Sequence, residues 1–355
     1  MKVTRISVYQ IPLPSRDLES SKHLFTTKKV SDSVIVRIET DEGITGLGEV
    51  CTIGSYYMRG FAEGAAAGVP ILARTLIGED PFLIDRHNRH WDAIFKDDLY
   101  VKTPLDMALW DIVGQAVGRP VCDLLGGRYP GQPSLYRSIY SPPDVRVTPK
   151  DVVNGCLDAR RDGFSHFQLK PGKNRDTSID EEIEHIQAVA DIKQPHESII
   201  IDANANWTLT TALRAANALR DLPVIFEQPC RTWEECINFR KHCSLPVKLD
   251  ELIEEPQDII RGFQAGAMDI VAIKVARVGG LTKARRMRDL ALDLGLTVVP
   301  DDAWGSEIVS SSLLHFAAST DPKYLLCYTD LTDYVEVSTA SGYPKRDGGN
   351  ISASN

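Results

Sequence analysis

The sequence lacks both an apolar run near twenty residues and a charged-then-apolar leader after Met1. A membrane-spanning helix needs about 20 apolar residues, and a secretion signal needs a basic start before a shorter apolar stretch. A basic stripe, through which nucleic acid is bound, is also missing: the formal net charge is −9, and Lys28-Lys29 is too short to form one. We therefore expect a cytoplasmic protein that binds neither a membrane nor nucleic acid.

The cysteines lack the spacing of a disulfide framework or a zinc site. There are seven, an odd number, and the series Cys230, Cys236 and Cys243 is spaced more widely than structural zinc ligands. We expect reduced, mostly buried thiols. With 43% apolar and 25% charged residues the composition is that of an ordinary globular protein, and 355 residues allow two domains or one barrel with additions.

The first part of the chain, residues 1–128, predicts an α+β capping domain. Strands are expected at 3–11, 33–40 and 45–50, with a turn at Gly43 between the last two, and helical patterns at 61–76, 82–94 and 104–117. Thr103 is the expected N-cap of the last helix, with Pro104 at its first position. The Pro- and Gly-rich stretch 129–133 is typical of a linker.

From Ser134 onward, short apolar strands alternate with helical segments. The strands fall near Leu135, Phe167, Ile200, Ile225, Val247, Ile270, Val298 and Leu325. Eight strands and seven helices predict the α/β class, with a (β/α)7β TIM-like barrel over residues 129–330. We expect residues 331–355 to return to the capping domain. A doubly wound open sheet is the alternative, although no GxGxxG motif follows a strand.

Three of the apolar runs each end in a carboxylate. They read IIIDAN, VIFEQP and VKLDE, and the acids are Asp202, Glu227 and Asp250. In an α/β barrel the carboxyl ends of the strands meet at one face, where catalytic groups collect. Carboxylate oxygens are the ligands of hard divalent cations. The pattern predicts a divalent-cation site, and three unrelated loop acids are the alternative.

Two further strands end in lysine. FQLK ends at Lys170 on the second barrel strand and VAIK at Lys274 on the sixth, so the lysines face each other across the barrel mouth. This layout favours proton transfer beside a carboxylate held by the cation. A lysine base must be partly neutral near pH 7, which requires a pKa lowered by about three units. A Schiff-base aldolase is the competing use of a barrel lysine.

With these residues in view, the chain resembles the enolase superfamily, within it the mandelate racemase and muconate lactonizing enzyme group, over nearly its whole length. The motifs are TDEGITGLGE, PLDMALWDIVGQAVGRPVCDLLGG, Lys170, Asp202-Ala203-Asn204, Glu227-Gln228-Pro229, Asp250-Glu251, Lys274 and Gly279-Gly280. The resemblance implies Mg2+, with Mn2+ as an alternative, on Asp202, Glu227 and Asp250. It also implies Lys170 and Lys274 as acid and base, and an enolate intermediate.

Departures from the family pattern narrow the resemblance. Gln168 stands where the family often has the first lysine of Lys-x-Lys, and Asp301-Asp302 follow the seventh strand. The chain is therefore similar to the two-lysine branch of cycloisomerases, dipeptide epimerases, proline-betaine epimerases and hydroxyproline dehydratases. Its segment PDDAWG is most similar to the enzymes of proline derivatives, and the segment Tyr328-Thr329-Asp330 stands where betaine epimerases place an aromatic residue.

Substrate contacts are expected from residues near the strand ends and from two loops. The loops, about 16–30 and 51–60, resemble lids over the barrel mouth, and ordinary surface loops are the alternative. The candidates for binding substrate or supporting the site are Gln168, Asn204, Glu251, Asp301, Asp302, Trp304, Tyr328, Tyr56 and Tyr57. Asp301 and Asp302 beside the indole of Trp304 would suit a cationic amine. The alternative is that these residues form a solvated turn without a binding role.

The sequence as a whole predicts an enzyme that abstracts the α-proton of a small amino-acid-type carboxylate. Racemisation or epimerisation of a proline-like substrate is the first expectation. A dehydratase of the cis-3-hydroxy-L-proline type, which uses the same enolate, is the second. A cycloisomerase, an aldolase and a non-catalytic metal-binding protein complete the alternatives. We expect a homo-oligomer.

Overall fold

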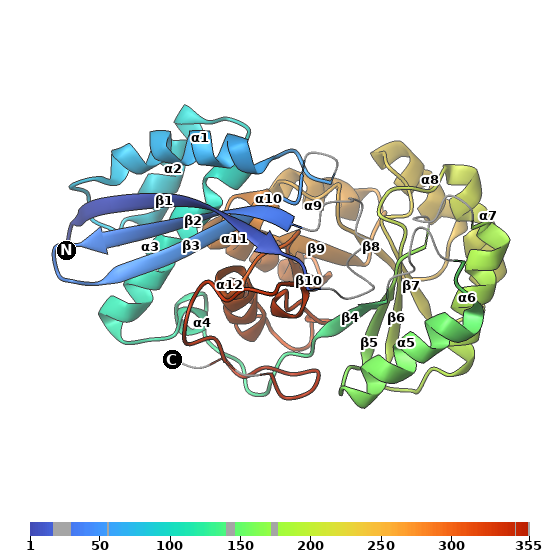
Figure 1. Cartoon of the computed structure of the whole chain (residues 1–355). Coiled ribbons are helices and arrows are strands. Elements are labelled where there is room, and N and C mark those ends of the chain that lie inside the picture. The colour runs from blue at the N-terminus through green and yellow to red at the C-terminus, as the bar shows by residue number, and fades with distance from the viewer. Residues whose placement is uncertain (17–29, 55–56, 140–145, 172–176, 345, 354–355) are drawn as a thin grey trace.

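The computed structural model describes residues 1–355 except 17–29, 55–56, 140–145, 172–176, 345 and 354–355. Figure 1 shows two regions side by side, an antiparallel sheet with helices at the N-terminal end and a curled parallel sheet ringed by helices. No helix in the described part of the chain combines the length and the apolar character that a membrane crossing requires.

The N-terminal region is a three-stranded meander covered by helices. Its strands, in the order β1-β2-β3, are β1 (Val3–Pro14), β2 (Val30–Thr40) and β3 (Thr45–Cys51). Its helices are α1 (Ala62–Ala73), α2 (Ile84–Ile94), α3 (Thr103–Val117) and α4 (Val121–Leu124), with 3-10 turns η2 (Arg74–Leu76) and η3 (Leu99–Val101). The expected strands and helices of this region are therefore confirmed.

Two glycines of β3 let α3 lie directly on the sheet. A Cβ on Gly48 would stand 1.8 Å from the carbonyl oxygen of Pro104, and one on Gly46 would stand 2.2 Å from that of Ala108. Real Cβ atoms do not approach backbone so closely, so both positions require glycine. The motif GITGLGE thus encodes the contact between sheet and helix.

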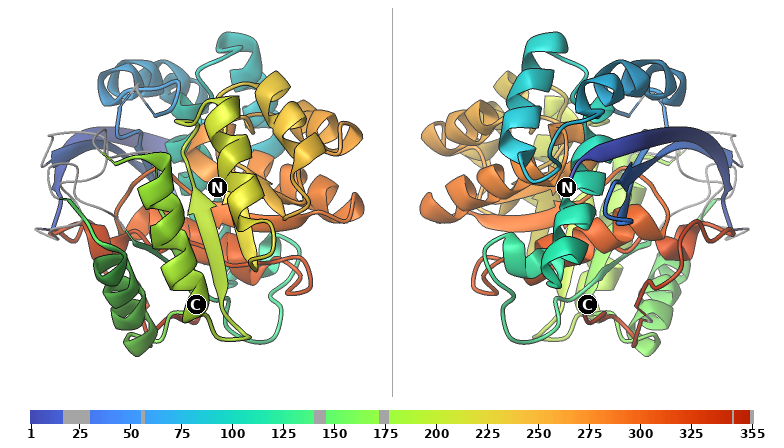
Figure 2. Two further views of the ribbon diagram at one scale, coloured as in Figure 1. Left: turned by 90° about the vertical axis from the view of Figure 1, so that its right-hand side faces the viewer. Right: turned by 90° about the vertical axis from the view of Figure 1, so that its left-hand side faces the viewer.

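The second region contains a parallel sheet in the order β10-β9-β8-β7-β6-β5-β4. In chain order the strands are β4 (Tyr136–Ile139), β5 (His166–Leu169), β6 (Ser198–Asp202), β7 (Val224–Glu227), β8 (Val247–Leu249), β9 (Ile270–Lys274) and β10 (Thr297–Asp301). The helices are α5 (Pro149–Arg161), α6 (Ile179–Asp191), α7 (Leu209–Leu219), α8 (Trp233–His242), α9 (Pro256–Gln264), α10 (Val275–Val278), α11 (Leu281–Asp293) and α12 (Glu307–Ala318). Figure 2 shows α5 to α8 outside the strands.

A short eighth segment closes the sheet into a barrel. Leu325 forms a parallel bridge with Val298 of β10, and Tyr328 forms one with Leu135, next to β4. The Tyr136 N–H donates to the Tyr328 carbonyl at 3.0 Å. No described helix separates this segment from β4 in the ring, so the (β/α)7β architecture is confirmed and the doubly wound sheet is not the fold.

Helix starts in the barrel follow local sequence signals. Thr148, Ser178 and Thr232 precede α5, α6 and α8, and each accepts a hydrogen bond from the backbone N–H three residues later. The acidic side chain at that third position accepts a hydrogen bond from the backbone N–H of the cap residue, which completes a capping box. These caps fix where each helix begins, and hence the length of each loop at the carboxyl ends of the strands.

Two buried carboxylates connect the regions. Glu49 of β3 accepts hydrogen bonds from Ser306 Oγ at 2.6 Å and from the Val309 N–H at 3.2 Å, so it caps α12 from the other region. Asp106 of α3 accepts from Thr282 Oγ1 at 2.6 Å and from Asn88 Nδ2 at 2.6 Å. Glu49 and Asp106 are fully buried.

Thr103 corrects one expectation. It is the first residue of α3 and not its N-cap, which is Lys102. The Thr103 hydroxyl donates to the Ala276 carbonyl at 3.0 Å. The hydroxyl that we expected to cap the helix therefore forms a hydrogen bond with the barrel.

Residues 332–336 lie beside the end of the N-terminal sheet, whereas Asn350 bridges Ser134 next to the barrel strand β4. A 3-10 turn, η4 (Thr332–Tyr334), leads to Val335, which bridges Ser15 at the end of β1. The Glu336 N–H donates to the Pro14 carbonyl at 2.9 Å. All seven cysteines are buried and free, as expected.

Candidate active site

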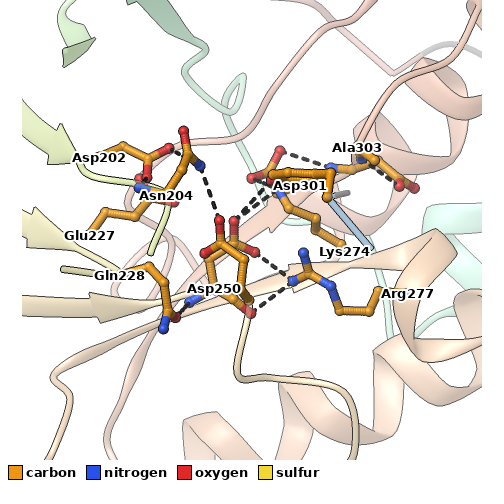
Figure 3. A network of polar contacts seen from close by, with 12 residues as sticks. Asp202, Asn204, Glu227, Gln228, Asp250, Lys274, Arg277, Asp301 and Ala303 are labelled. Carbon is orange, nitrogen blue, oxygen red and sulfur yellow. Dashed lines mark hydrogen bonds and ion pairs between the residues drawn. The ribbon is translucent and has the colours of Figure 1, made fainter. Parts of the chain in front are cut away.

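The three predicted acids lie together at the carboxyl edge of the barrel. Asp202 and Glu227 are the last residues of β6 and β7 and stand opposite each other in register, and Asp250 directly follows β8. Each is at most 1% exposed. Figure 3 shows the three carboxylates pointing into one space, facing Lys274 and Asp301.

The tightest group of carboxylates has a different third member from the predicted one. Glu227, Asp250 and Asp301 each offer an oxygen within 4.8 Å of the others. Asp202 instead faces Lys170, whose ammonium donates to its Oδ2. We did not predict Asp301 in this group, because its position in the sequence suggested a residue of the substrate pocket.

Asn204 holds Asp202 in place. Its Nδ2 donates to Asp202 Oδ2 at 3.0 Å and to Glu251 Oε1 at 3.1 Å, and its backbone N–H donates to Asp202 Oδ1 at 2.9 Å. The backbone of Asn204 has φ +45, which asparagine tolerates better than most residues. The Asp202-Ala203-Asn204 motif is thus a local clamp on the carboxylate.

Lys274 lies between two carboxylates. Its Nζ is 3.3 Å from Asp250 Oδ2 and donates to Asp301 Oδ2 at 2.5 Å. Burial alone lowers the pKa of Lys274, but the charges of Asp250 and Asp301 outweigh it, so that pKa lies well above its usual value. This direction is opposite to the lowered pKa expected from the sequence, since both carboxylates here face the ammonium directly.

Arg277 is a residue that the sequence reasoning missed. Its Nη1 donates to Asp250 Oδ1 at 2.7 Å and to the Asp250 carbonyl at 2.8 Å. Burial opposes ionisation of Asp250, yet Lys274 and Arg277 lower its pKa. The available signal was helical spacing, because Arg277 follows Lys274 by three residues in a turn at the strand end.

Glu227 is held from two sides. Gln168 Nε2 donates to its Oε2 at 2.8 Å, and Lys248 Nζ lies 2.8 Å from its Oε1. Ser138 Oγ in turn donates to Gln168 Oε1 at 2.7 Å. Burial raises the pKa of Glu227 to about 7; Asp202 adds to the rise and Lys248 opposes it. Lys248 was also missed, although a lysine two residues before Asp250 shares its side of the strand.

Two further acids have raised pKa values. Burial, with the charge of Asp250, raises the pKa of Glu251 to about 8. Burial also raises the pKa of Asp302 to about 7, although its oxygens accept from the N–H groups of Ala303 at 2.7 Å and Ala276 at 2.9 Å. Asp302 therefore organises the turn after β10, and Asp301 faces Lys274.

A small cavity lies at the barrel mouth. Its volume is about 40 Å³, above the roughly 10–15 Å³ that one water needs. Its lining comprises Ile53, Tyr57, Tyr136, Ser138, Gln168, Lys170, Asn204, Lys274, Asp301, Asp302, Ala303, Trp304, Thr329, Leu331 and Tyr334. Both lysines thus face one space. A larger cavity, of about 220 Å³ beside α3 and α12, is lined by none of the predicted site residues.

The N-terminal region contributes directly to this mouth. The Tyr57 hydroxyl donates to Asp250 Oδ2 at 3.2 Å, and Lys274 Nζ lies 5.6 Å from the centre of its ring. Cys51 forms an antiparallel bridge with Trp304, whose indole lies 5.3 Å from the Tyr334 ring. Tyr56 and most of the loop 16–30 lie outside the described residues. The described part of the loop 51–60 reaches the acids.

Tyr328 does not line the cavity. It is fully buried in the closing segment of the barrel, and its hydroxyl has no hydrogen-bond partner in the described part of the chain. The next residue, Thr329, faces the cavity instead. Because side chains alternate along a strand, the side chain nearest the mouth is Thr329.

The donor set fits a hard divalent cation. Glu227 Oε1 and Glu251 Oε2 are buried acceptors that receive no hydrogen bond from the described residues. Asp250 and Asp301 each offer an oxygen within 4.8 Å of Glu227, and Asp202 stands beside Glu227 in register. All-oxygen sets of this kind suit Mg2+ or Ca2+ and not the softer metals that prefer thiolate or imidazole.

This fold and site define a class: a capped (β/α)7β-barrel enzyme whose acids and lysines meet at the carboxyl ends of the strands. Comparison with known families then identifies the particular group. Residues 151–355 match the enolase C-terminal domain-like family, and residues 9–126 match the N-terminal domain of mandelate racemase and muconate lactonizing enzyme. The chain belongs to the enolase superfamily, in its mandelate racemase and muconate lactonizing enzyme group, and is an enzyme of that superfamily.

Individual relatives cover almost the whole chain. It is 38% identical to a cis-3-hydroxy-L-proline dehydratase of Roseibium aggregatum, over 100% of this chain and 94% of the relative. It is 27% identical to an N-succinyl-L-Arg/Lys racemase of Bacillus cereus, over 94% and 87%. A member of the enolase superfamily from Roseovarius nubinhibens ISM, solved with magnesium, superposes with a TM-score of 0.90 at 31% identity, over 99% and 92%.

Proposed function

We propose that this enzyme removes the α-proton from a small cyclic amino acid, with dehydration of a 3-hydroxylated proline as its reaction. The observation that carries the proposal is that Lys170 and Lys274 line one cavity beside a row of buried carboxylates. The identity of 38% with a cis-3-hydroxy-L-proline dehydratase over the full chain supports the substrate class.

Asp202, Glu227 and Asp250 are the proposed ligands of Mg2+, with Mn2+ as a substitute. When bound, the cation supplies positive charge that stabilises the negative charge developing on the substrate carboxylate. This proposal assigns Asp301 to Lys274, whose ammonium donates to its Oδ2 at 2.5 Å, and not to the cation. Arg277 and Asn204 fix the orientation of Asp250 and Asp202 through the hydrogen bonds described above.

The two lysines stand on opposite sides of the substrate site in this proposal. Lys170 follows β5 and Lys274 ends β9, and three acid-bearing strands separate these two in the sheet order. A substrate whose carboxylate lies toward the acids therefore presents its α-carbon between the two side chains. One lysine takes the α-proton, and the other is placed to work on the opposite face.

The substrate amine is proposed to lie toward Asp301 and Asp302. Both acids line the cavity, and the indole of Trp304 lies beside them. An ammonium group is stabilised by a carboxylate and by an aromatic face. A proline-like ring places its amine next to the α-carbon, so one small cavity can hold both groups.

Dehydration follows from α-proton removal when the ring carries a 3-hydroxyl. The α C–H bond breaks, and its electron pair forms a C=C bond as the C–O bond at the β-carbon breaks. The departing hydroxide takes a proton from the second lysine and leaves as water. The products are water and a cyclic enamine.

Epimerisation is the second candidate, and the two-lysine geometry favours it. Without a β-hydroxyl, a proton delivered by the opposite lysine to the α-carbon inverts its configuration. The racemase from Bacillus cereus shows that this outcome occurs among the relatives. The same protein surface therefore supports both outcomes, and the substituent on the ring decides between them.

Reaction in D2O with a panel of proline derivatives tests the proposal. We expect loss of water from the 3-hydroxylated substrate, and deuterium at the α-carbon of substrates without a hydroxyl. EDTA should abolish both signals and added Mg2+ should restore them. The absence of both water loss and deuterium exchange across the whole panel would falsify the substrate assignment. Activity that persists in EDTA, together with a lysine–substrate adduct trapped by borohydride, would instead identify an aldolase.

We propose three segments: a capping domain at 1–128, the barrel at 129–330 and a returning segment at 331–355. A homo-oligomer in the cytoplasm is the proposed form of the enzyme. Size-exclusion chromatography with light scattering tests the assembly, and a monomer at working concentration would contradict it.

A further inference from the structure

Lys248 is a charged residue inside the barrel, one layer below the acids. Side chains alternate along a strand, so Lys248 points to the same side as Asp250. The neighbouring interior positions are filled by an apolar cluster, which consists of Tyr136, Ile200, Ile270, Val299 and Cys327. Lys248 is fully buried beside this cluster.

The partner of Lys248 is Glu227. Its Nζ lies 2.8 Å from Glu227 Oε1, and both side chains are 0% exposed. The Nζ also lies 5.6 Å from the centre of the Tyr136 ring. Neither Nζ nor Oε1 forms a hydrogen bond of good geometry with a described residue. Charge, and not directional bonding, therefore holds the pair together.

Burying such a pair is costly, and an apolar side chain of similar size is often at least as stable at such a position. Packing alone therefore does not explain a lysine here. The surrounding charges do: Asp202 stands opposite Glu227 in register, and Asp250 and Asp301 each have an oxygen within 4.8 Å of it. Without a positive charge beneath Glu227, these acids repel one another at short range.

We propose that Lys248 is an internal counter-ion of the metal centre, which stabilises the barrel when no cation is bound and weakens the binding of the cation. The inference rests on the proposed metal ligands Asp202, Glu227 and Asp250. Its two effects have the same origin. A fixed positive charge next to Glu227 offsets repulsion among the acids, and it repels any cation that replaces it at that carboxylate.

Replacement of Lys248 by Met, Lys248→Met, separates these effects from packing. The metal-free variant should melt at a lower temperature than the wild type. Saturating Mg2+ should recover most of that loss, because the bound cation takes over the role of the ammonium. Titration calorimetry should show Mg2+ binding roughly tenfold tighter than in the wild type. An equal loss of melting temperature with and without Mg2+, or weaker Mg2+ binding, overturns the proposal.

Lys102 provides the matched control. It is also 0% exposed, but its Nζ binds Asp92 Oδ1 at 2.7 Å beside α3, and Asp92 is not a proposed metal ligand. Lys102→Met should lower the melting temperature equally with and without Mg2+ and leave Mg2+ affinity unchanged. A Mg2+-dependent loss in this variant as well would show that any buried lysine gives the effect, and the proposal would fail.

A double variant covers the case in which Lys248→Met does not fold without metal. Glu227→Gln combined with Lys248→Met removes both charges of the pair and keeps their volumes. It should melt near the wild type in the absence of metal, and failure to restore stability contradicts the counter-ion role. This melting test needs no metal and no turnover. It stays decisive even when the wild type shows no Mg2+ binding, the result that overturns the proposed function.

Discussion

Two sets of buried carboxylates in this molecule have opposite kinds of hydrogen-bond partners. At the junction of the two regions, Glu49 and Asp106 are surrounded by neutral donors, namely the hydroxyl groups of Ser33, Ser306 and Thr282 and nearby N–H groups. At the barrel mouth, acids face one another and share lysines and an arginine, and Glu251 Oε2 receives no donor from the residues that the structure describes. Burial raises the pKa of Glu49 and Glu227 alike.

The difference teaches what each set is for. A buried carboxylate with every oxygen satisfied contributes to stability and leaves nothing for a ligand to bind. A buried carboxylate with spare acceptors is costly to the fold and available to a cation. Substitutions at the junction should therefore change melting, whereas substitutions at the mouth should change binding and turnover.

The largest effect is expected at the lysines of the mouth. Lys170→Ala or Lys274→Ala should reduce turnover by roughly 10²- to 10⁴-fold, the range for loss of a positioned acid or base. With saturating Mg2+ the melting temperature should change little, because the bound cation replaces the lost positive charge beside the acids. Steady-state kinetics on a 3-hydroxylated proline and thermal melts provide the measurements, with Lys283→Ala as a control distant from the acids. Full activity of the double variant Lys170→Ala/Lys274→Ala would sink the mechanism.

The next largest effect is expected at Glu49. Glu49→Ala leaves the N–H groups of Ser306 and Val309 without their acceptor, and each buried unsatisfied group costs about 1–3 kcal/mol. A total of about 3 kcal/mol corresponds to roughly 6–12 °C for a domain of about 200 residues. Calorimetry should show this fall, while Glu39→Ala on the neighbouring strand should melt as the wild type does. Unchanged melting would remove the contrast between junction and mouth.

A third effect concerns pH at the junction. Burial, with Arg128, lowers the pKa of His315 to about 4, and its Nδ1 accepts the Cys122 N–H at 3.3 Å. Between pH 6.5 and 4 the unfolded chain binds a proton at this site and the folded chain does not. Stability is therefore present above about pH 6.5 and is lost as pH falls, by at most about 3 kcal/mol.

Urea unfolding from pH 7 to pH 4 measures this loss. His315→Asn keeps an acceptor for the Cys122 N–H but cannot titrate, so its stability should fall less steeply over the same window. Identical slopes for variant and wild type would assign the acid sensitivity to other groups.

The smallest effect is expected at Tyr57, which joins the N-terminal region to the mouth. Tyr57→Phe removes the hydrogen bond to Asp250 Oδ2, worth about 1 kcal/mol or roughly fivefold in binding. Because that donor competes with a cation for the same oxygen, Mg2+ binding should tighten by about that factor with melting nearly unchanged, and Tyr9→Phe on exposed β1 serves as control. A large loss of melting temperature would place Tyr57 with the junction residues.

Much of the fold, and the positions of the acids and lysines at the strand ends, follow from local sequence. Asp202, Glu227 and Asp250 each end an apolar run, so strand periodicity alone places them on one edge. Lys170 and Lys274 follow by the same rule. The structure places all five where strand order puts them, and their chemical roles stay predictions.

The rest depends on contacts between distant segments, which no local pattern encodes. Glu49 lies inside a glycine motif and reads as a strand residue, yet it caps α12 more than 250 residues away. Thr103 reads as an N-cap, yet its hydroxyl binds the barrel. Lys248 was predictable from strand alternation, but its partner Glu227 lies on another strand.

The pairing of the two ends of the chain has a consequence for synthesis. Ser15 bridges Val335, and the Arg16 N–H donates to the Tyr334 carbonyl at 3.1 Å, so the base of the first loop is completed by residues more than 300 positions later. A ribosome adds about 5–20 residues per second, and earlier domains fold first. The acids and lysines of the barrel therefore leave the ribosome before Tyr334 and Val335, which pair with the two residues directly after β1. A nascent chain that ends before Leu331 is therefore expected to contain all five acids and lysines and yet lack Leu331 and Tyr334, which line the cavity between them.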